Sequence, residues 1–246
     1  MMIEINIVKT FKNFTLKINE TFKQYEFYAL YGKSGSGKTT FFRVLSGLEK
    51  SEGIIKVNKK IWQDKKFFLP PQKRDIGYVF QDYALFPNMN VLENLLFVKK
   101  DKKLAMKLLD IVEMTPFINR MPNTLSGGQK QRVALVRALM KEPKILLLDE
   151  ALSALDEEVK EKIKKEILII HNEFKLTTFM ISHQKEDIHD LATKVININN
   201  GNIVSIEKVQ KTIHLSPTII NDQLVFIPNE KLSSDSIKNS HFKITT

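Results

Sequence analysis

The sequence of 246 residues predicts an α/β fold: a mainly parallel β-sheet with an N-terminal antiparallel β subdomain and an α-helical subdomain. Two short, continuous apolar runs, Phe27–Tyr31 and residues 144–148, have the profile of strands that are buried on both faces of a parallel sheet. Segments with helical spacing separate such runs, and this alternation places helices on the faces of the sheet. The first residues (Ile3, Ile5 and Ile7) alternate with polar ones, which is typical of antiparallel strands with one face in water.

The predicted elements follow one another along the chain. Strands are expected at residues 3–7, 14–18, 27–31, 76–80, 144–148 and 177–181, with hairpins at residues 53–61 and around Asn200 and Gly201. Helices are expected at residues 38–48, 128–140 and 157–171, with a helical insert at residues 87–122. The insert and the start of the next helix form the predicted helical subdomain, residues 87–135. Residues 206–246 are polar and weakly patterned, and predict either a small β appendage or a loose tail.

Composition limits the kind of protein. The chain has no cysteine, which excludes a disulfide framework and a thiolate metal site. No run approaches the roughly 18 to 20 uninterrupted apolar residues that span a bilayer, and the alternating start is unlike a secretion signal. We therefore expect a cytoplasmic chain, unless another protein holds it at a membrane.

The formal net charge is +10. Lysines are spread along the whole chain, in pairs such as Lys59-Lys60 and Lys99-Lys100, without a dense basic arm or interleaved aromatic residues. We interpret them as solvated surface lysines, with contact to phospholipid or nucleic acid as the alternatives.

Residues 32–39 form a complete G-x-x-x-x-G-K-[ST] phosphate loop (Walker A) between a predicted strand and a predicted helix. Glycines let successive backbone N–H groups face phosphate oxygens, and the helix N-terminus adds unpaired donors. Lys38 brings a positive charge to the β- and γ-phosphates, and the Thr39 hydroxyl ligates Mg²⁺. No Asn-Lys-x-Asp segment follows, which disfavours GTP. The predicted nucleotide-binding residues here are Gly32, Lys33, Ser34, Gly35, Ser36, Gly37, Lys38, Thr39 and Thr40.

Two acidic residues end the apolar strand at residues 144–148. Asp149 is expected to hold a water on Mg²⁺, and Glu150 to polarise the attacking water. The alternative is that these acids only favour the N-terminus of the next helix. With a phosphate loop upstream, we interpret them as the hydrolytic acids.

A second anion-binding turn is predicted at residues 125–129. The Ser-Gly-Gly segment at residues 126–128 opens a helix and presents another set of N–H donors. One nucleotide does not need two such sites, so the second is expected to serve the ATP of a neighbouring molecule. The alternative is an ordinary helix N-cap at Ser126.

The ordered set of motifs resembles the nucleotide-binding subunit of ABC transporters over residues 1–205. The motifs are the phosphate loop, Val79-Phe80-Gln81-Asp82, residues 125–129 followed by Lys130-Gln131-Arg132, residues 146–150, Ser153-Ala154-Leu155-Asp156 and His183. The resemblance implies a P-loop NTPase (RecA-like) fold, an ABC ATPase domain over residues 1–205, and hydrolysis of ATP with Mg²⁺ coupled to solute transport.

The resemblance also implies roles for the matching residues. Gln81 would sense the γ-phosphate, and His183 would hydrogen-bond it and order the attacking water. The implied catalytic residues are Glu150, His183, Lys38 and Gln81. The implied magnesium ligands are Thr39, Gln81 and, through a water, Asp149.

Further implied roles concern the second copy and the base. Asp156 would lie on the dimer seam, and adenine would stack on Phe11, with Phe14 as the next candidate. The signature residues that would grip the γ-phosphate of the other copy are Ser126, Gly127, Gly128 and Gln129.

Residues 69–87 resemble bacterial importer ATPases, in which the matching segment forms the groove for a cytoplasmic helix of a separate permease. Phe86, Met89 and Leu92 would line that groove; the alternative is core packing of the helical insert. Residues 14–22 and the short insert are most similar to molybdate importer subunits, with tungstate, sulfate, iron, polyamine and sugar importers as alternatives. The implied partners are a second copy, membrane permease subunits and, indirectly, a solute-binding protein. The chain would be peripheral on the cytoplasmic side of the cell (inner) membrane, without nucleic acid.

Two features depart from that family. Ala151 stands where the family usually has proline, which would restrict Glu150 to extended geometry, so the base is expected to be less firmly aimed. The C-terminal region is too short for the oxyanion-binding domain of many molybdate subunits, so regulation by bound solute is not expected. The rival functions are a non-transport ABC ATPase acting on DNA or ribosomes, and an inert ATP-binding regulatory module.

Overall fold

The computed structural model describes residues 2–153, 155–209, 215–220 and 223–228. The chain divides into two compact units, Met1–Val209 and Gln210–Thr246. In the second unit, β11 (Leu215–Ile220) and β12 (Gln223–Pro228) pair as antiparallel strands. This hairpin lies in the region where the sequence left a β appendage or a loose tail open. The rest of that predicted region after Val209, and Ala154, lie outside the described residues.

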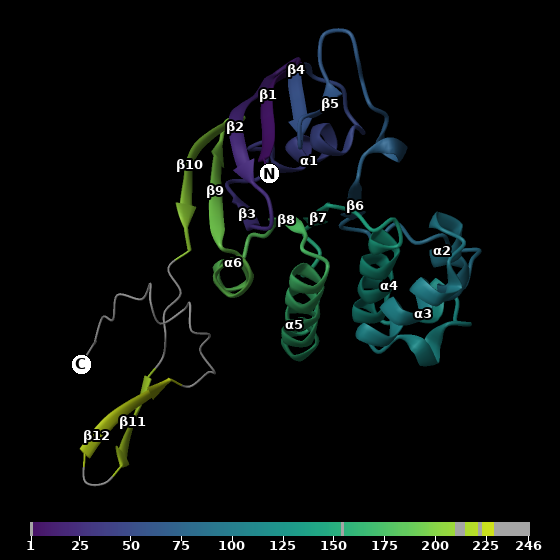
Figure 1. Ribbon diagram of the computed structural model, residues 1–246, viewed down its shortest axis with the longest axis vertical. Helices are drawn as coiled ribbons and strands as arrows, with labels where there is room; N and C mark the ends of the chain where they lie inside the picture. The colour runs from purple at the N-terminus through teal and green to yellow at the C-terminus, as the bar shows by residue number, and fades with distance from the viewer. Residues whose placement is uncertain (1, 154, 210–214, 221–222, 229–246) are drawn as a thin grey trace. The chain divides into compact units, whose positions relative to one another are not determined.

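A ten-stranded sheet runs through the first unit in the order β5-β4-β1-β2-β10-β9-β3-β8-β7-β6 (Figure 1). Its strands are β1 (Met2–Phe11), β2 (Phe14–Lys23), β3 (Phe27–Tyr31), β4 (Glu52–Val57), β5 (Lys60–Gln63), β6 (Ile76–Val79), β7 (Ile145–Asp149), β8 (Thr177–Ile181), β9 (Lys194–Asn199) and β10 (Asn202–Lys208). From β9 to β6 all neighbours are parallel, whereas β1, β2, β4 and β5 pair antiparallel. The predicted α/β fold, with an antiparallel N-terminal part, is confirmed.

The α-helices of this unit are α1 (Lys38–Ser46), α2 (Val91–Val98), α3 (Lys102–Ile111), α4 (Gly127–Leu139), α5 (Glu157–Glu173) and α6 (Lys185–Leu191), with short 3-10 helices at Pro71–Lys73, Thr115–Phe117 and Pro122–Thr124. α2, α3 and α4 contact one another and lie together next to β6 (Figure 1). α6 was not predicted, because its seven residues are too few for a helical period and no side chain caps its start. None of the helices in the described part of the chain is long and apolar enough to cross a bilayer.

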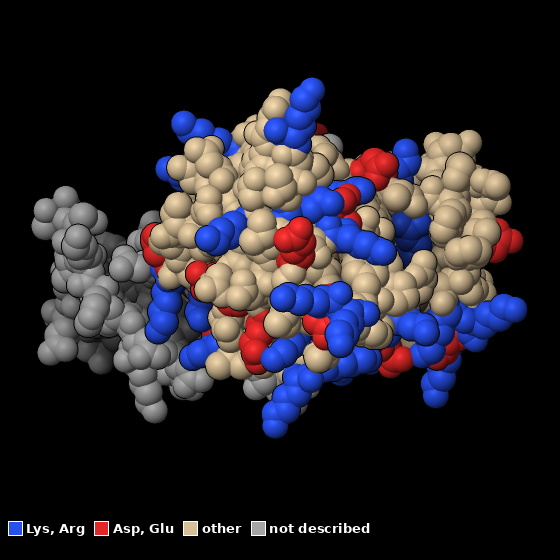
Figure 2. Space-filling model, turned by 90° about the horizontal axis from the view of Figure 1, so that it is seen from above, with Lys and Arg blue, Asp and Glu red and all other residues tan. Residues whose placement is uncertain are grey.

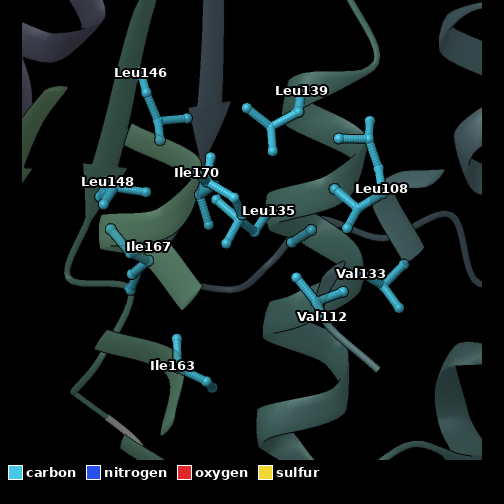
Figure 3. Close-up of a cluster of buried hydrophobic side chains, with 14 of the residues drawn as sticks. Leu108, Val112, Val133, Leu135, Leu139, Leu146, Leu148, Ile163, Ile167 and Ile170 are labelled. Atoms are coloured by element: carbon cyan, nitrogen blue, oxygen red, sulfur yellow. The ribbon is translucent and has the colours of Figure 1, made fainter. Parts of the chain in front are cut away.

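The central strands separate two hydrophobic cores. Leu146 and Leu148 of β7 face a cluster shared with α3, α4 and α5 (Figure 3). Ile145 and Leu147 of the same strand face a second cluster, shared with α1 and the antiparallel strands. Because both faces are covered, this strand carries an unbroken apolar run.

A buried arginine ties the end of α1 to the loop before β6. Arg74 is 1% exposed. Its guanidinium donates to the carbonyls of Val44 (2.9 Å), Leu45 (2.6 Å) and Leu69 (2.9 Å), and lies 5.6 Å from the Trp62 ring centroid. Burial lowers the pKa of Arg74 to about 10, so the side chain remains charged at neutral pH. This cation also complements the negative end of the α1 dipole.

We expect Arg74→Met to lower the free energy of unfolding by about 2 to 4 kcal/mol, because the carbonyls of Val44 and Leu45 lose a charged donor inside the protein. Urea denaturation at pH 7 measures the loss. Arg120, an exposed arginine over the Phe117 ring, provides the matched control. Arg120→Met is expected to change stability by no more than about 0.5 kcal/mol. An equally small change for Arg74→Met would show that Arg74 does not stabilise the contact between the end of α1 and the loop before β6.

A buried histidine makes the fold sensitive to acid. His171 of α5 is 7% exposed; its Nδ1 lies 2.9 Å from the Thr178 hydroxyl, and its ring centroid 5.3 Å from that of Phe27. Burial lowers the pKa of His171, although the charge of Glu26 opposes the shift. The folded chain therefore binds a proton at His171 less readily than the unfolded chain does.

Stability should fall as the pH drops below the ordinary histidine pKa of about 6.5, because the unfolded chain then takes up a proton that folded His171 resists. The contribution is fully present above this pH, and is lost as the pH falls through the lower, folded pKa. We expect the urea midpoint of the wild type to decrease between pH 7.5 and 5.5 more steeply than that of His171→Gln. Equal slopes would show that His171 does not cause the acid sensitivity.

Candidate active site

The predicted catalytic residues meet at one edge of the sheet. β3, β8, β7 and β6 are neighbours in this order and run parallel, so their carboxyl ends lie at the same edge. Gly32 and Glu150 directly follow β3 and β7, and Gln81 and His183 stand two positions after β6 and β8. The sheet topology thus brings together segments that are far apart in the sequence.

Two glycines of the phosphate loop have no room for a side chain. A Cβ on Gly32 would lie 2.2 Å from the carbonyl oxygen of Ile198. Gly37, the N-cap of α1, has a φ of 105°, and a Cβ there would lie 2.7 Å from the Phe14 ring. The loop can therefore follow this path only with glycine at these positions. It leads directly into the N-terminus of α1, where the first backbone N–H groups lack helical partners.

Two polar side chains of the loop fit a phosphate chain. The Lys38 ammonium is buried and donates to the loop carbonyls of Gly32 (2.8 Å) and Lys33 (3.0 Å). Burial lowers the pKa of Lys38, and the carboxylates of Glu150 and Asp149 oppose this shift. The Ser36 side chain is 5% exposed, and its hydroxyl has no hydrogen-bond partner among the described residues. A phosphate oxygen would satisfy both groups.

Asp149 is held by two hydroxyl groups. The Tyr78 hydroxyl donates a 2.8 Å hydrogen bond to Asp149 Oδ2, and the Thr39 side chain also bonds this carboxyl group. Burial raises the pKa of Asp149, and these hydrogen bonds partly offset the shift. In turn, burial and the Asp149 charge raise the pKa of Tyr78. Its hydroxyl therefore stays protonated and can donate to Asp149. Its ring stacks on Phe80 with centroids 4.0 Å apart.

The residues around Asp149 fit a magnesium ion that accompanies a triphosphate. The described residues contain no cluster of three His, Asp or Glu side chains that could hold a metal alone. Mg²⁺ is usually bound by one or two carboxylates together with substrate phosphates and water, so the Asp149–Thr39 pair matches its preference for oxygen ligands.

Glu150 is gripped at both carboxylate oxygens. Gln81 Nε2 donates to Glu150 Oε2 at 3.0 Å, and His183 Nε2 lies 3.0 Å from Glu150 Oε1. Glu150 has a φ of 48°, a left-handed conformation that is uncommon for a residue other than glycine. A following proline would favour extended backbone instead, whereas Ala151 permits this geometry. A small cavity of about 80 Å³ lies beside Glu150 and His183.

The Ser-Gly-Gly turn lies at the start of α4. Ser126 is exposed, and it caps the helix by a reciprocal pair of hydrogen bonds with Gln129 (3.3 and 3.0 Å). Gly128 packs on α5, and a Cβ there would lie 2.5 Å from Val159 Cγ1. In residues 2–153 and 155–209, no hydrogen bond joins residues 126–129 to the phosphate loop. One copy thus uses the turn as an N-cap, and Ser126 and Gly127 remain open to another molecule.

The other predicted residues lie on exposed or partly exposed surface. Phe11 is 41% exposed, with its ring centroid 6.3 Å from that of Phe14, at the turn between β1 and β2. Phe14 itself covers Gly37. Asp156 is exposed at the N-terminus of α5, and its side chain makes no capping hydrogen bond.

The residues predicted to line the permease groove differ in how far they are buried. Leu92 packs against the first hydrophobic core, as the alternative expected, whereas Phe86 remains 37% exposed. Phe97, which sequence reasoning missed, is 63% exposed, and its ring centroid lies 4.7 Å from that of Phe86. Arg137 lies 5.3 Å from the Phe86 ring centroid. Met89, the third predicted groove residue, is partly buried, and Phe86 and Phe97 form an exposed aromatic pair on this surface.

The chain resembles known proteins over most of its described length. Residues 15–153 match the family described as ABC transporter. The chain is 38% identical to the "Molybdenum import ATP-binding protein ModC" of Saccharophagus degradans, over 91% of this chain and 64% of that protein. It is 41% identical to the "Sulfate/thiosulfate import ATP-binding protein CysA" of Bacillus cereus, over 72% of this chain and 52% of that protein. The chain therefore spans less than two thirds of the length of these relatives.

A solved structure of the same fold supports the match. A dimeric, post-hydrolysis state of the ATP-binding cassette MJ0796, bound to ADP and Pi, is 30% identical and superposes with a TM-score of 0.73. The superposition covers 85% of this chain and 99% of that one. Since the family match covers more than half of the chain and agrees with the fold, the protein belongs to the ABC transporter family, in its ATP-binding cassette fold.

Proposed function

We propose that this chain is the ATP-hydrolysing, energy-coupling subunit of an ABC importer, working as a pair of copies. The observation that carries the proposal is the Gln81–Glu150–His183 cluster at the carboxyl edge of the sheet, next to the phosphate loop. A carboxylate with two fixed neighbours beside a phosphate site is suited to activating water for phosphoryl transfer.

In the proposed reaction, backbone N–H groups of the loop and Lys38 hold the triphosphate, and Glu150 accepts a proton from the attacking water. His183 and Gln81 keep Glu150 and the water in line with the γ-phosphate. Asp149 and Thr39 would hold magnesium, which would supply positive charge to offset the charge that develops on the phosphate oxygens. Positioning and charge stabilisation supply most of the rate enhancement in such reactions.

The second copy completes the pocket in this proposal. Ser126 and Gly127 are exposed at a helix N-terminus, which favours an anion, and in one copy they make no hydrogen bond to the phosphate loop. Two solved structures of one similar cassette, MJ0796, are dimeric by their own descriptions. ATP would join the two copies, and hydrolysis to two mutually repelling anions would release them.

The proposed membrane partner is a permease that docks on Phe86 and Phe97. The buried Asn94 fixes the loop before α2 by bonding the backbone of Phe86 (2.9 and 3.1 Å) and Met89 (2.9 Å). Arg137 also donates to the carbonyl of Tyr83 (2.9 Å). A rigid, exposed aromatic pair is suited to receiving a short helix. The chain would thus be peripheral on the cytoplasmic side of the membrane.

The proposed solute is a tetrahedral oxyanion of the class that contains molybdate and tungstate. Support comes from relatives that are named for import of molybdenum and of sulfate or thiosulfate. On the face in Figure 2, Lys and Arg side chains are interspersed with acidic and uncharged ones, which favours solvated lysines over a nucleic-acid site.

The test is solute uptake in cells that lack this chain, complemented by the wild type or by Glu150→Gln. We expect cellular molybdenum, measured by mass spectrometry at limiting molybdate, to recover only with the wild type. If cells with Glu150→Gln lost only sulfate uptake, sulfate and not molybdate would be the transported solute. Unchanged uptake of all candidate solutes, or ATPase stimulation by DNA, would contradict the importer proposal.

A further inference from the structure

A cluster of buried charges lies directly behind the loop that carries His183. Lys160 and Lys164 stand one turn apart on α5, and Asp187 lies in the first turn of α6. All three side chains are less than 5% exposed. The Lys160 ammonium lies 2.7 Å from Asp187 Oδ1, and the Lys164 ammonium lies 3.4 Å from the same oxygen.

The cluster hydrogen-bonds both sequence neighbours of His183, Ser182 and Gln184. The Ser182 hydroxyl donates to Asp187 Oδ2 at 3.2 Å and accepts from the Gln184 backbone N–H at 3.1 Å. The Lys160 ammonium donates a hydrogen bond to the side-chain oxygen of Gln184. His183 itself is 47% exposed in its side chain and contacts Glu150. The backbone on each side of this exposed side chain is therefore anchored to buried charges.

The same cluster reaches the site and the start of α5. Asp187 and Glu150 line the same cavity of about 80 Å³. The Lys160 backbone N–H donates to the Asp156 carbonyl at 2.9 Å, one turn from the predicted dimer seam. Lys164 is held further by Asp190 (2.7 Å) and Glu161 (2.6 Å). Burial alone would lower the pKa of Lys164, but these hydrogen bonds outweigh it and the pKa is raised, so the lysine stays charged.

Stability alone does not account for these ions. Removing charges from water carries a large desolvation cost for each ion, and apolar side chains of similar volume often stabilise a fold as well or better. A set of directed ion pairs and hydrogen bonds, however, fixes a loop in one geometry where apolar packing would allow several. The position of the cluster, behind His183 and beside Glu150, indicates which loop is fixed.

We propose that Asp187, with Lys160, is a positioning residue that holds the Ser182–His183–Gln184 loop so that His183 meets Glu150 and the γ-phosphate. This inference rests on the proposed ATPase function. Asp187 does not touch the reacting atoms; it acts through Ser182, and Lys160 acts through Gln184.

The test compares Asp187→Asn with Glu166→Gln in the full chain. Glu166 is a matched control because it is also a buried carboxylate paired with a cation, Arg132 at 3.0 Å, but it faces α4 instead of the His183 loop. We expect Asp187→Asn to lower kcat by ~10-fold or more with KM for ATP within about two-fold of the wild type, since misplacement of a catalytic group costs up to about 10²-fold. Glu166→Gln should lower thermal stability without lowering kcat of the folded protein.

A spectroscopic readout separates positioning from folding. In protein labelled at histidine Cε1, the signal of His183 is assigned by its loss in His183→Gln, and that of His171 serves as an internal reference. We expect Asp187→Asn to shift or broaden the His183 signal and to leave the His171 signal in place. If Asp187→Asn does not fold, the pair Lys160→Met with Asp187→Leu leaves Lys164 its partners Asp190 and Glu161, and should give the same shift and the same loss of kcat.

Three outcomes overturn the proposal. They are a folded Asp187→Asn or double variant with wild-type kcat, an unmoved His183 signal in either, and a loss of kcat in Glu166→Gln as large as that in Asp187→Asn. If the wild type hydrolyses no ATP, the proposed function fails, but the His183 signal still decides whether the cluster positions the loop.

Discussion

Glu150→Gln is expected to lower ATP turnover at least ~10²-fold while ATP binding persists, because the amide keeps the shape of the side chain but cannot accept the water proton. Gln81 and His183 contact the two carboxylate oxygens at 3.0 Å each, so the proposed base is already held in one orientation. Phosphate release in excess Mg²⁺ measures turnover, and a fluorescent ATP analogue measures binding.

The control for this variant is Glu142→Gln. Glu142 is an exposed carboxylate that also accepts from a cation, Lys99 at 2.6 Å, but lies outside the predicted site. Its turnover should match the wild type. If Glu150→Gln retained turnover within a few-fold of the wild type, Glu150 would not be the base. Absence of Mg²⁺-dependent turnover in the wild type itself would instead favour the inert regulatory module.

Ser126→Arg is expected to abolish ATP-dependent dimer formation and turnover. In a single copy, Ser126 only caps α4, and losing the cap costs about 1 kcal/mol, which should leave the fold and ATP binding intact. In a pair, the long cationic side chain would enter the space where the signature turn meets the γ-phosphate of the other copy. Light scattering with ATP, in a chain that also carries Glu150→Gln to prevent hydrolysis, measures dimer formation.

Asn90→Arg is the matched control for this variant. Asn90 caps α2 by the same reciprocal pair of hydrogen bonds, here with Glu93 (2.8 Å each), and the substitution adds the same charge. We expect this variant to form ATP-dependent dimers as the parent does. Dimer formation by Ser126→Arg at wild-type affinity would mean that the turn at residues 126–129 is only a helix cap.

The fold was predictable where an element has a clear hydrophobic pattern in the sequence. The apolar run before Asp149 and the alternation at Ile3, Ile5 and Ile7 match β7 and β1, because burial on two faces or one leaves a clear pattern. Helix α6 left no such pattern. Its position depends on contacts with α5 that are distant in sequence, such as Lys164 with Asp190, 26 residues apart, and in a short helix those contacts outweigh periodicity.

The motif residues of the site were predictable from the sequence, but the residues that hold them in place were not. Lys38, Asp149 and Glu150 stand in patterns whose chemistry is specific. Tyr78 lies inside an apolar strand, and nothing in its sequence position indicates that its hydroxyl meets Asp149 across β6 and β7. Asp187 likewise reads as a surface acid of a polar segment until α5 and α6 are packed together.

The proposal that two copies together form each ATP pocket is tested most directly by the dependence of ATP turnover per chain on protein concentration. If each copy needs the Ser126 turn of the other, turnover per chain should rise with concentration, over the range in which light scattering shows dimers forming with ATP. Constant turnover per chain at concentrations where the protein is entirely monomeric would contradict the account, since one copy would then hydrolyse ATP unaided.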